Sequence, residues 1–240
     1  MSLFSKKDLK RKITIPKNYS NDLAELLGIL TGDGYITHYR KYNYIIEVAG
    51  NKIKDKEYLF NYVFNLFIKL FNIKPNKIKK KNQNTIYIRA LSKRIFIYLV
   101  ELGFKKGRKG EIGIPFWIKE NKNFSLAFIK GLLDTDGCLC FKKKEGKLYP
   151  VISISSASFT LLNNVKKIIK ALNIASYLGK ESRKNSCYKK RIVSYKLQIN
   201  GINNCRKWIK KIGSNNKRNL EMFSRFYQLY GGTGSRTPAP

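Results

Sequence analysis

Apolar residues recur at helical spacing in two short stretches of the chain, and each stretch ends in Asp-Gly. The first covers residues 23–34 and the second covers residues 125–137. Apolar positions three or four residues apart predict one buried face of an α-helix, and the closing glycines allow the backbone to turn out of it. The two aspartates, Asp33 and Asp136, are 103 positions apart. The chain therefore reads as two copies of one unit of about a hundred residues.

The remainder of the first unit alternates between strand and helix patterns. Asp22 and Glu25 form a capping-box pattern at the start of the first helix, in which Asp22 would cap the helix and Glu25 would reach back. Residues rich in β-branched and aromatic side chains predict strands that begin at Tyr35 and cover 44–49 and 85–90. Helical spacing predicts helices over 58–70 and 95–102.

The second unit repeats this order after a basic, glycine-rich link over 103–113. The apolar segment 114–118 contains Pro115, so we expect it to be extended, with Trp117 packed into a core. Helices are predicted over 125–135, 161–172, 205–212 and 220–230, and strands over 138–142, 149–155, 177–182 and 194–199. Each unit is then roughly αββαββα, which makes the fold class α+β with two pseudo-symmetric units.

The predicted elements divide the chain into five parts. Residues 1–19 are a basic N-terminal arm, which we expect to be flexible and able to hold phosphates; a frayed terminus is the alternative. The first repeat covers 20–109, a linker covers 110–123, and the second repeat covers 124–230. Residues 231–240 contain three glycines and two prolines and are predicted to be a flexible tail.

The net charge of the chain indicates the class of its binding partner. Lys and Arg number 49 against 15 Asp and Glu, a formal net charge of +34 spread along the whole chain. A polyanionic partner is a physical reason to keep that much self-repulsion. A compositional bias toward Lys, Ile and Asn is the alternative, but it does not explain the scarcity of acids. Nucleic acid is therefore the expected partner, ahead of an anionic membrane, because no basic amphipathic helix stands out.

The remaining composition excludes several classes of protein. No apolar run reaches the roughly 18 residues of a membrane span, and the first residues lack the apolar core of a secretory signal. We expect a cytoplasmic protein, or one of an organellar matrix if it is encoded there. The spacing of the cysteines and of the single histidine, His38, does not fit a zinc site. Buried or inert thiols are expected for all four cysteines: Cys138, Cys140, Cys187 and Cys205.

One predicted strand shows how a sheet could meet DNA. Over 194–199, apolar side chains alternate with Ser194, Lys196 and Gln198, so one face can sit on helices and the other is polar. Such side chains suit base edges and phosphates in a major groove, although an ordinary solvated face is the alternative. The residues predicted to bind DNA are Tyr35, Thr37, Arg40, Arg89, Lys142, Ser194, Lys196 and Gln198.

The two helices that end in Asp-Gly share a stripe of small residues. Gly28 and Gly32 are four apart in the first, and Gly131 and Thr135 take the matching places in the second. Small residues at this spacing let two helices approach closely. Each glycine costs about 1 kcal/mol of helix propensity relative to alanine, so close packing is a reason to keep it. We therefore predict that the two units pack through these helices.

That packing would bring Asp33 and Asp136 together at the negative ends of two helix dipoles. Folding alone gives no reason for such like-charge repulsion. Two carboxylates together with a phosphate suit Mg²⁺. A lone Asp-Gly is more often a simple turn signal, but two copies at matched positions favour a metal site.

The two stretches, Leu26-Leu27-Gly28-Ile29-Leu30-Thr31-Gly32-Asp33-Gly34 and Ile129-Lys130-Gly131-Leu132-Leu133-Asp134-Thr135-Asp136-Gly137, resemble the LAGLIDADG motif of homing endonucleases. The resemblance extends from Ser20 to Tyr230. It implies two αββαββα units whose antiparallel sheets form a saddle over the DNA major groove. The first motif has Thr31 where the family often has an earlier aspartate, which the second keeps as Asp134. Because the last acid of the motif is the more critical one, Thr31 does not imply inactivation.

The resemblance also implies site residues. Asp33 and Asp136 would bind catalytic metal, and Gly32 and Thr135 would offer main-chain carbonyls. By position, the basic residues near the scissile phosphates would be Lys109 and Lys217. The polar residues that orient water would be Asn51 and Ser156.

The implied activity is site-specific, metal-dependent hydrolysis of both DNA strands across the minor groove, leaving short 3′ overhangs. The cofactor would be Mg²⁺ or another divalent cation such as Mn²⁺, and Ca²⁺ would bind without supporting cleavage. The protein would be encoded in an intron or intein and act in homing as a monomer on a long asymmetric target, with no protein partner. A non-catalytic nucleic-acid binder of the same fold, such as an RNA maturase or a DNA-binding regulator, is the alternative.

Overall fold

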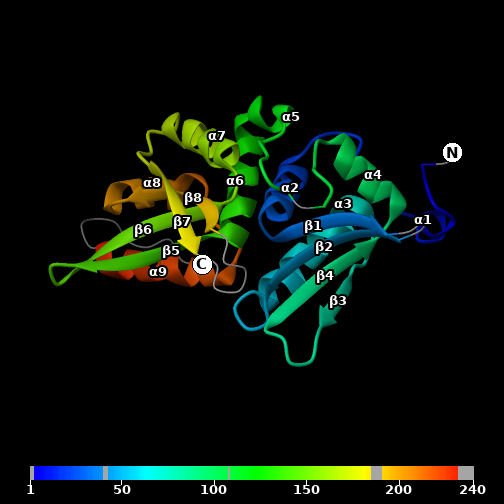
Figure 1. Ribbon diagram of the computed structural model, residues 1–240, viewed down its shortest axis with the longest axis horizontal. Helices are drawn as coiled ribbons and strands as arrows, with labels where there is room; N and C mark the ends of the chain where they lie inside the picture. Colours follow the sequence, from blue (N-terminus) through cyan, green and yellow to red (C-terminus); the bar gives the residue numbers. More distant parts are fainter. Residues whose placement is uncertain (1–2, 40–42, 108, 185–190, 232–240) are drawn as a thin grey trace.

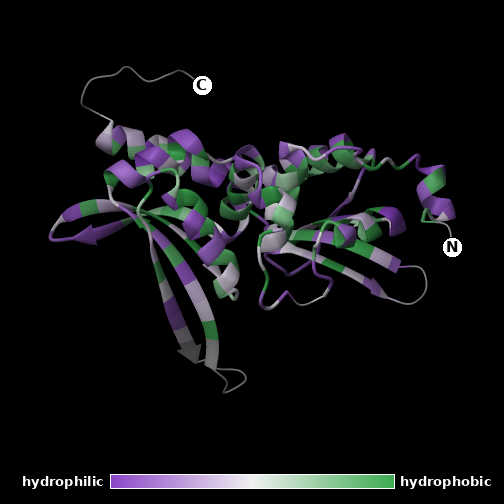
Figure 2. Ribbon diagram, turned by 90° about the horizontal axis from the view of Figure 1, so that it is seen from above, coloured by the Kyte–Doolittle hydropathy of each residue, from purple (hydrophilic) through white to green (hydrophobic). Residues whose placement is uncertain are grey.

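The computed structural model describes residues 3–39, 43–107, 109–184 and 191–231. Arg40, Cys187 and residues 232–240 of the predicted tail lie outside this part of the chain. Two units lie side by side, and each carries one four-stranded antiparallel sheet (Figure 1). The strands of both sheets lie on one side of the molecule and most helices on the other (Figure 2). No helix of the described residues has the length and apolar character that crossing a membrane requires.

The first sheet has the strand order β1-β2-β4-β3. Its strands are β1 (Gly34–Tyr39), β2 (Asn43–Asn51), β3 (Asn76–Lys79) and β4 (Thr85–Leu91). A π-helix, η2 (Tyr58–Val63), continues into α3 (Phe64–Phe71), and α4 (Lys93–Glu101) follows the sheet. The left-handed Asn72 ends α3, as glycine or asparagine commonly does after a helix.

The second sheet repeats that topology in the order β5-β6-β8-β7. Its strands are β5 (Gly137–Lys144), β6 (Lys147–Ser156), β7 (Tyr177–Lys184) and β8 (Arg191–Asn200). Its helices are α7 (Phe159–Lys170), α8 (Ile202–Lys211) and α9 (Lys217–Tyr230). The predicted α+β class with two αββαββα units is confirmed. The second unit closes with one further helix, α9, where a helix was predicted over 220–230.

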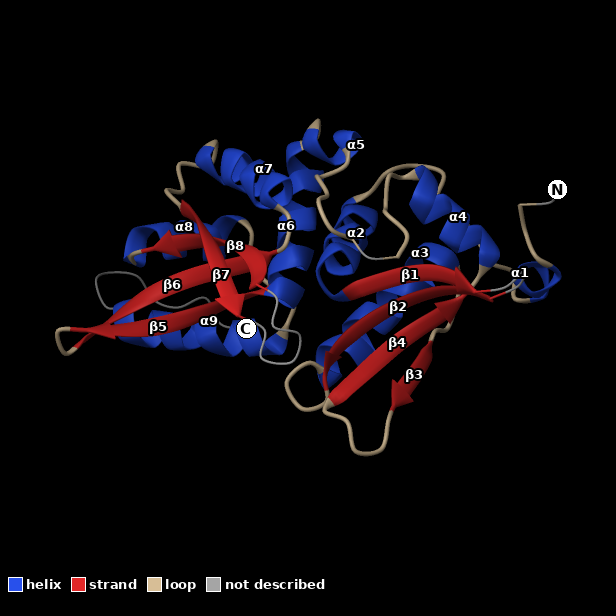
Figure 3. Ribbon diagram, in the orientation of Figure 1, coloured by secondary structure: helices blue, strands red, loops and turns tan. Residues whose placement is uncertain are grey.

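Two central helices join the units, with the red sheets on either side of them in Figure 3. They are α2 (Asn21–Asp33) and α6 (Lys122–Asp136). One continuous apolar core extends through both units and includes Leu26, Phe67, Phe128 and Trp208. The two repeats are therefore packed as one body.

The start of α2 differs from the prediction. Ser20 caps the helix by accepting a hydrogen bond from the Leu23 amide at 3.2 Å. Asp22 instead pairs with Lys69 at 2.5 Å. Glu25 is buried in the interface between the units, where its carboxylate accepts a hydrogen bond from Tyr62 Oη at 2.7 Å. The predicted capping box is wrong because this carboxylate has partners in the tertiary structure.

The described part of the N-terminal segment is folded, which corrects the expectation of a flexible arm. Ser5 and Asp8 form a capping box at α1 (Lys6–Lys10). Asp8 is buried and also accepts a hydrogen bond from the Arg94 amide at 3.3 Å. Ile13 is buried in the core, and the Thr14 amide donates to the Phe71 carbonyl at 3.1 Å.

The segment before α6 is also different from the prediction. Residues Phe116–Lys119 form a short helix, α5, which starts directly after Pro115. Proline is well tolerated at a helix N-terminus, so it marks the start of a helix here and not an extended segment. Trp117 is half-buried at the edge of the core and stacks on Tyr19, with ring centroids 4.2 Å apart.

The described cysteines are free thiols. Cys205 is buried, and that burial raises its pKa to about 11. Cys138 and Cys140 are half-buried. The domain boundaries given above stay predictions.

Candidate active site at the ends of the paired helices

Helices α2 and α6 are in main-chain contact along their small residues. A Cβ on Gly28 would lie 2.0 Å from the Phe128 carbonyl oxygen, and one on Gly131 would lie 2.4 Å from the Glu25 carbonyl oxygen. One on Gly32 would lie 2.0 Å from Thr135 Oγ1. All four residues of the predicted stripe therefore lie in this interface, and only a residue without a side chain fits at the three glycine positions.

This packing brings the two predicted metal-binding aspartates to one place. Asp33 is the last residue of α2 and Asp136 is the last residue of α6. A Cβ on Gly32 would lie 3.4 Å from the carboxyl carbon of Asp136, so this carboxyl group lies against the end of α2. Each aspartate leads directly into the first strand of its sheet, which sets the pair at the junction of the two sheets.

Both carboxylates are held in an unfavourable environment for charge. Burial raises the pKa of Asp136 to about 7, with a further contribution from Asp33 and partial compensation by Lys109. The pKa of Asp33 is also raised, first by burial and then by Asp55, while Lys109 and Arg218 act in the opposite direction. A positive charge bound between them would relieve this repulsion.

Lys109 supplies positive charge to the site. Its ammonium donates hydrogen bonds to the main-chain carbonyls of Leu30 at 3.1 Å, Thr31 at 2.7 Å and Gly32. Burial lowers its pKa, against the attraction of Asp136 and Asp33. The ammonium thus binds the carbonyl end of α2, where the helix dipole is negative.

The loop between α8 and α9 forms the other side of the site. Its folding depends on the buried Asp134, which accepts hydrogen bonds from the Ser214 hydroxyl and from the Asn215 amide at 2.8 Å. Burial raises the pKa of Asp134 to about 6, although these hydrogen bonds lower it. Asp134 therefore fixes the loop that leads through Asn216 into α9, whose first two residues are Lys217 and Arg218.

Arg218, and not Lys217, points into the site. One of its terminal nitrogens lies 3.5 Å from the Asp134 carbonyl oxygen and 3.4 Å from that of Gly137. Lys217 lies on the outside and pairs with Glu57 at 3.1 Å. The structure therefore places Arg218, and not the predicted Lys217, beside the paired helix ends, because α9 begins at Lys217 and turns successive side chains in different directions.

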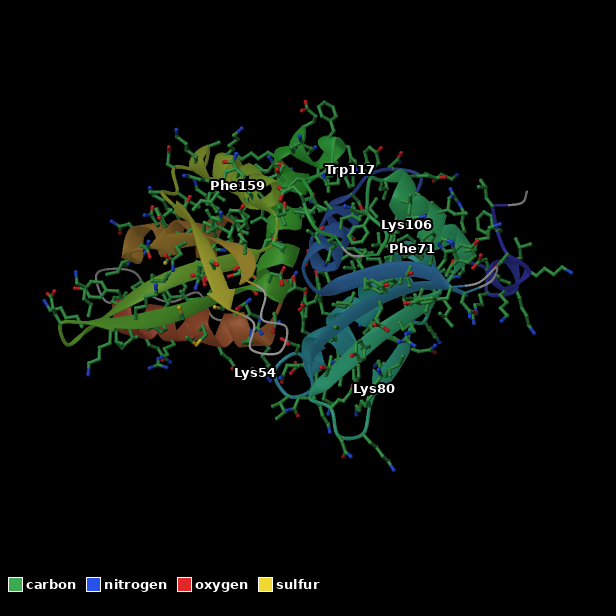
Figure 4. All side chains as sticks on the ribbon, in the orientation of Figure 1. Lys54, Phe71, Lys80, Lys106, Trp117 and Phe159 are labelled. Carbon is green, nitrogen blue, oxygen red and sulfur yellow. The ribbon has the colours of Figure 1, made fainter. Side chains whose placement is uncertain are left out.

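Asn51 and Ser156 are used in turns. The Asn51 side-chain oxygen accepts hydrogen bonds from the amides of Ile53 at 2.9 Å and Lys54 at 3.0 Å. The Ser156 hydroxyl accepts one from the Ser158 amide at 3.2 Å. These contacts engage the side chains that were predicted to orient water. The loop after β2 nevertheless lies close to the site, and Figure 4 shows Lys54 between the two units.

The donor set fits a hard divalent cation completed by its substrate. In the described part of the chain, no cluster of three or more His, Cys, Asp or Glu could hold a metal by itself. Mg²⁺ commonly uses one or two carboxylates together with phosphate oxygens and water. The Lys109 ammonium already binds the Gly32 carbonyl beside the two carboxylates, which marks this position as one that accepts a cation.

Apart from Arg40, which is outside the described residues, the predicted DNA-binding side chains lie on the strands of the two sheets. Tyr35 and Lys142 are exposed, and Thr37 is half-buried. Arg89 pairs with Glu47 at 2.5 Å, directly across from it in the β2–β4 ladder. Lys196 lies 3.6 Å from Glu181. Ser194 and Gln198 share the partly exposed face of β8, whereas Leu197 and Ile199 are fully buried behind it.

The sequence model of the LAGLIDADG-like domain matches residues 123–213. The second unit is a LAGLIDADG-like domain. The first unit has the same order of elements and carries its LAGLIDADG-like stretch at the matching place, the end of α2.

Solved structures that are similar to this chain include the homing endonuclease I-DmoI. The complex of I-DmoI with DNA and Mn has a TM-score of 0.56 at 21% identity and covers 82% of this chain and 98% of I-DmoI. The complex of I-DmoI with DNA and Ca has a TM-score of 0.58 at 19% identity, covering 85% and 97%. I-SmaMI bound to uncleaved DNA has a TM-score of 0.50 at 11% identity, covering 88% and 90%. At these identities the likeness concerns the fold.

Two of the curated proteins that are similar in sequence follow. An uncharacterized protein of Methanocaldococcus jannaschii is 25% identical over 188 residues, which cover 75% of this chain and 66% of that protein. The ribonucleoside-diphosphate reductase NrdEB subunit alpha of Bacillus subtilis is 27% identical over 169 residues. That match covers 67% of this chain and only 15% of the reductase subunit, so the chain spans a small part of it.

The LAGLIDADG motifs identified the two aspartates in advance, but two other residues of the site were missed. Arg218 stands beside the chosen lysine, and its selection depends on where α9 begins. Asp55 lies in the loop after β2 and contacts Arg218 of the other unit at 3.4 Å. No pattern along the chain indicates a contact between residues so far apart in sequence.

Proposed function

We propose that this protein is a site-specific, metal-dependent DNA endonuclease that cuts both strands of an asymmetric duplex. The observation that carries the proposal is the pairing of Asp33 and Asp136 at the junction of two sheets, in a chain of net charge +34. Similar folds in complex with DNA and Mn or Ca, as in I-DmoI, support it. Cleavage across the minor groove with short 3′ overhangs, and action as a monomer in intron or intein homing, are parts of the same proposal.

The sheets would bind the duplex and the paired helix ends would face the scissile phosphates. Asp33 and Asp136 would hold Mg²⁺ or Mn²⁺, which would supply a Lewis acid for the attacking and leaving oxygens. Lys109 and Arg218 would donate hydrogen bonds to phosphate oxygens as negative charge develops. The Arg218 guanidinium is already held beside the site by Asp55 and by two main-chain carbonyls, so it would need little rearrangement.

The resting position of Lys109 has a consequence for the metal. Its ammonium binds the Gly32 carbonyl that was predicted as a metal ligand. An ammonium and a divalent cation on the same carbonyl oxygen would repel each other. We infer that the ammonium moves toward the phosphate when DNA and metal are bound, and that Asp33 and Asp136 stay in place.

The proposal is tested on a labelled duplex obtained by selecting a randomised library for binding in Ca²⁺. A nuclease cuts both strands when Mg²⁺ replaces Ca²⁺, and EDTA prevents it. A non-catalytic nucleic-acid binder, such as a maturase, retards the duplex in a gel in both metals and leaves both strands intact. If both strands stay intact in Mg²⁺ and in Mn²⁺ while the duplex is still retarded in the gel, the proposal of an endonuclease is rejected.

A further inference from the structure

Asp55 of the first unit reaches the basic residue of the second unit. Its Oδ1 lies 3.4 Å from a terminal nitrogen of Arg218 and accepts a hydrogen bond from the Asn216 side chain at 3.1 Å. Asn216 also donates to the Asp134 carbonyl oxygen at 2.9 Å. The start of α9, which carries Arg218, is therefore held from both sides of the interface, by α6 of its own unit and by Asp55 of the other.

Asp55 is itself fixed in place. It is 8% exposed, and its Oδ2 accepts a hydrogen bond from the Asn51 amide at 2.8 Å. The Asn51 side chain in turn closes the tight turn over Ile53 and Lys54. A carboxylate anchored by main-chain and side-chain donors loses little entropy when it binds a cation, so it can hold a guanidinium in one orientation.

Arg218 has hydrogen-bonding capacity left over. Its Nε is buried without a partner, and its other contacts are 3.4–3.5 Å long. Buried donors of this kind are normally satisfied. An anion oxygen, such as that of a phosphate, would supply the missing acceptor.

The corresponding loop of the first unit makes a different crossing. Its Glu111 accepts hydrogen bonds from the Thr160 amide at 2.6 Å and the Ser158 hydroxyl at 3.1 Å, at the start of α7. These contacts involve Glu111 and leave the nearby Lys109 ammonium on the carbonyls of α2. Asp55 of the first unit thus contacts Arg218 directly. Lys109 has no such carboxylate contact among the hydrogen bonds described above, because Glu111 binds the start of α7.

We propose that Asp55 is a positioning residue, which holds Arg218 for one of the two scissile phosphates and thereby makes the two strand-cutting centres unequal. The proposal rests on the endonuclease function above for its catalytic consequence. Its structural part, that Asp55 directs Arg218 toward a phosphate, applies to DNA binding alone.

The catalytic part is tested by following each strand separately. The selected duplex carries a different fluorophore on each strand, and single-turnover rates are measured in Mg²⁺. R218M is expected to slow one strand by about a hundredfold, as removal of one stabilising donor does. D55N is expected to slow the same strand and leave the other unchanged, and the double variant to be no slower than R218M, because the residues act as a unit. Glu57→Gln, which removes a nearby exposed acid, is the control and leaves both rates unchanged.

A purely structural role for Asp55 would slow both strands together, and that result would overturn the proposal. So would faster cutting by D55N, because it would mean that Asp55 restrains Arg218. Asp55→Glu, which keeps the carboxylate, is expected to restore part of the rate on the affected strand.

The binding part needs no cleavage. In Ca²⁺, the slope of log Kobs against log salt falls in magnitude by about 0.9 for each phosphate that the protein no longer neutralises. Both R218M and D55N are expected to show this decrease, and Glu57→Gln to show none. An unchanged or steeper slope for D55N would overturn the positioning role even if the wild-type protein cuts DNA. If the wild-type protein does not cut, the endonuclease fails and this slope still decides the role of Asp55.

Discussion

Lys109 is the residue that connects the charges of the site. Its ammonium lies on the carbonyl end of α2, and it acts on the pKa of both Asp33 and Asp136. Arg218 also lowers the pKa of Asp33 but binds a different set of carbonyls, near the end of α6. Lys109 and Arg218 therefore carry the same charge at different positions. Substituting each in turn separates the effect of position from the effect of charge.

We predict that K109M binds Ca²⁺ more tightly than the wild-type protein when DNA is absent, because the substitution frees the Gly32 carbonyl and leaves the two carboxylates uncompensated. A tenfold gain corresponds to about 1.4 kcal/mol. Isothermal titration calorimetry measures the affinity, and Ca²⁺ should raise the unfolding temperature of K109M more than that of wild type. R218M is the matched control: an equal gain in this variant would mean that loss of charge alone is responsible.

At the scale of elements, the contact between α2 and α6 leaves no room for an added atom at Gly28. We predict that Gly28→Ala destabilises the protein by about 3 kcal/mol, because its methyl group would overlap the Phe128 carbonyl and force the helices apart. Denaturant unfolding measures the change. Gly113→Ala is the control, since the nearest atoms to its methyl group would lie at 3.4 and 3.5 Å, and its effect should stay within about 0.5 kcal/mol. Equal stability of the two variants would contradict close packing.

The start of α7 depends on an acid from the link between the units. Hydrogen bonds from Thr160 and its neighbours hold the pKa of Glu111 below its usual range. A lowered folded-state pKa gives stability that is present above the unfolded-state pKa of about 4.3 and is lost as pH falls through the folded-state value. We predict that Glu111→Gln is less stable than wild type at pH 7 and that the difference closes below pH 4. Thermal unfolding at both pH values measures it; a difference that stays constant would contradict the assignment.

Sequence patterns predicted most elements because the apolar residues of each element follow either the helical or the strand period. The pattern does not reveal β3, in which Ile78 is the one large apolar residue among Asn76, Lys77 and Lys79. That strand forms because it pairs with β4, which is information from the tertiary structure. The same holds for the site: the repeated Asp-Gly endings identify Asp33 and Asp136, whereas Asp55 and Arg218 meet only after both units have folded.

At the scale of the whole molecule, duplication explains both the paired site and its asymmetry. Each unit contributes one LAGLIDADG helix, one sheet and one basic loop, and both loops cross to the start of a helix in the other unit. The contact in one loop is between Asn216 and Asp55, and the contact in the other is between Glu111 and Ser158. The two repeats therefore share a fold but differ in the residues that join the units. A chain of this kind has the parts for a two-strand reaction on a target whose halves differ.

The most direct measurement is cleavage of the selected duplex by wild type and by the double variant D33N/D136N, in Mg²⁺, with binding in Ca²⁺ measured on the same samples. The wild-type protein should cut both strands. The double variant should bind the duplex at least as tightly, because it carries two fewer negative charges, and should cut neither strand. Cleavage by the double variant at the wild-type rate would show that the paired aspartates are not the catalytic centre.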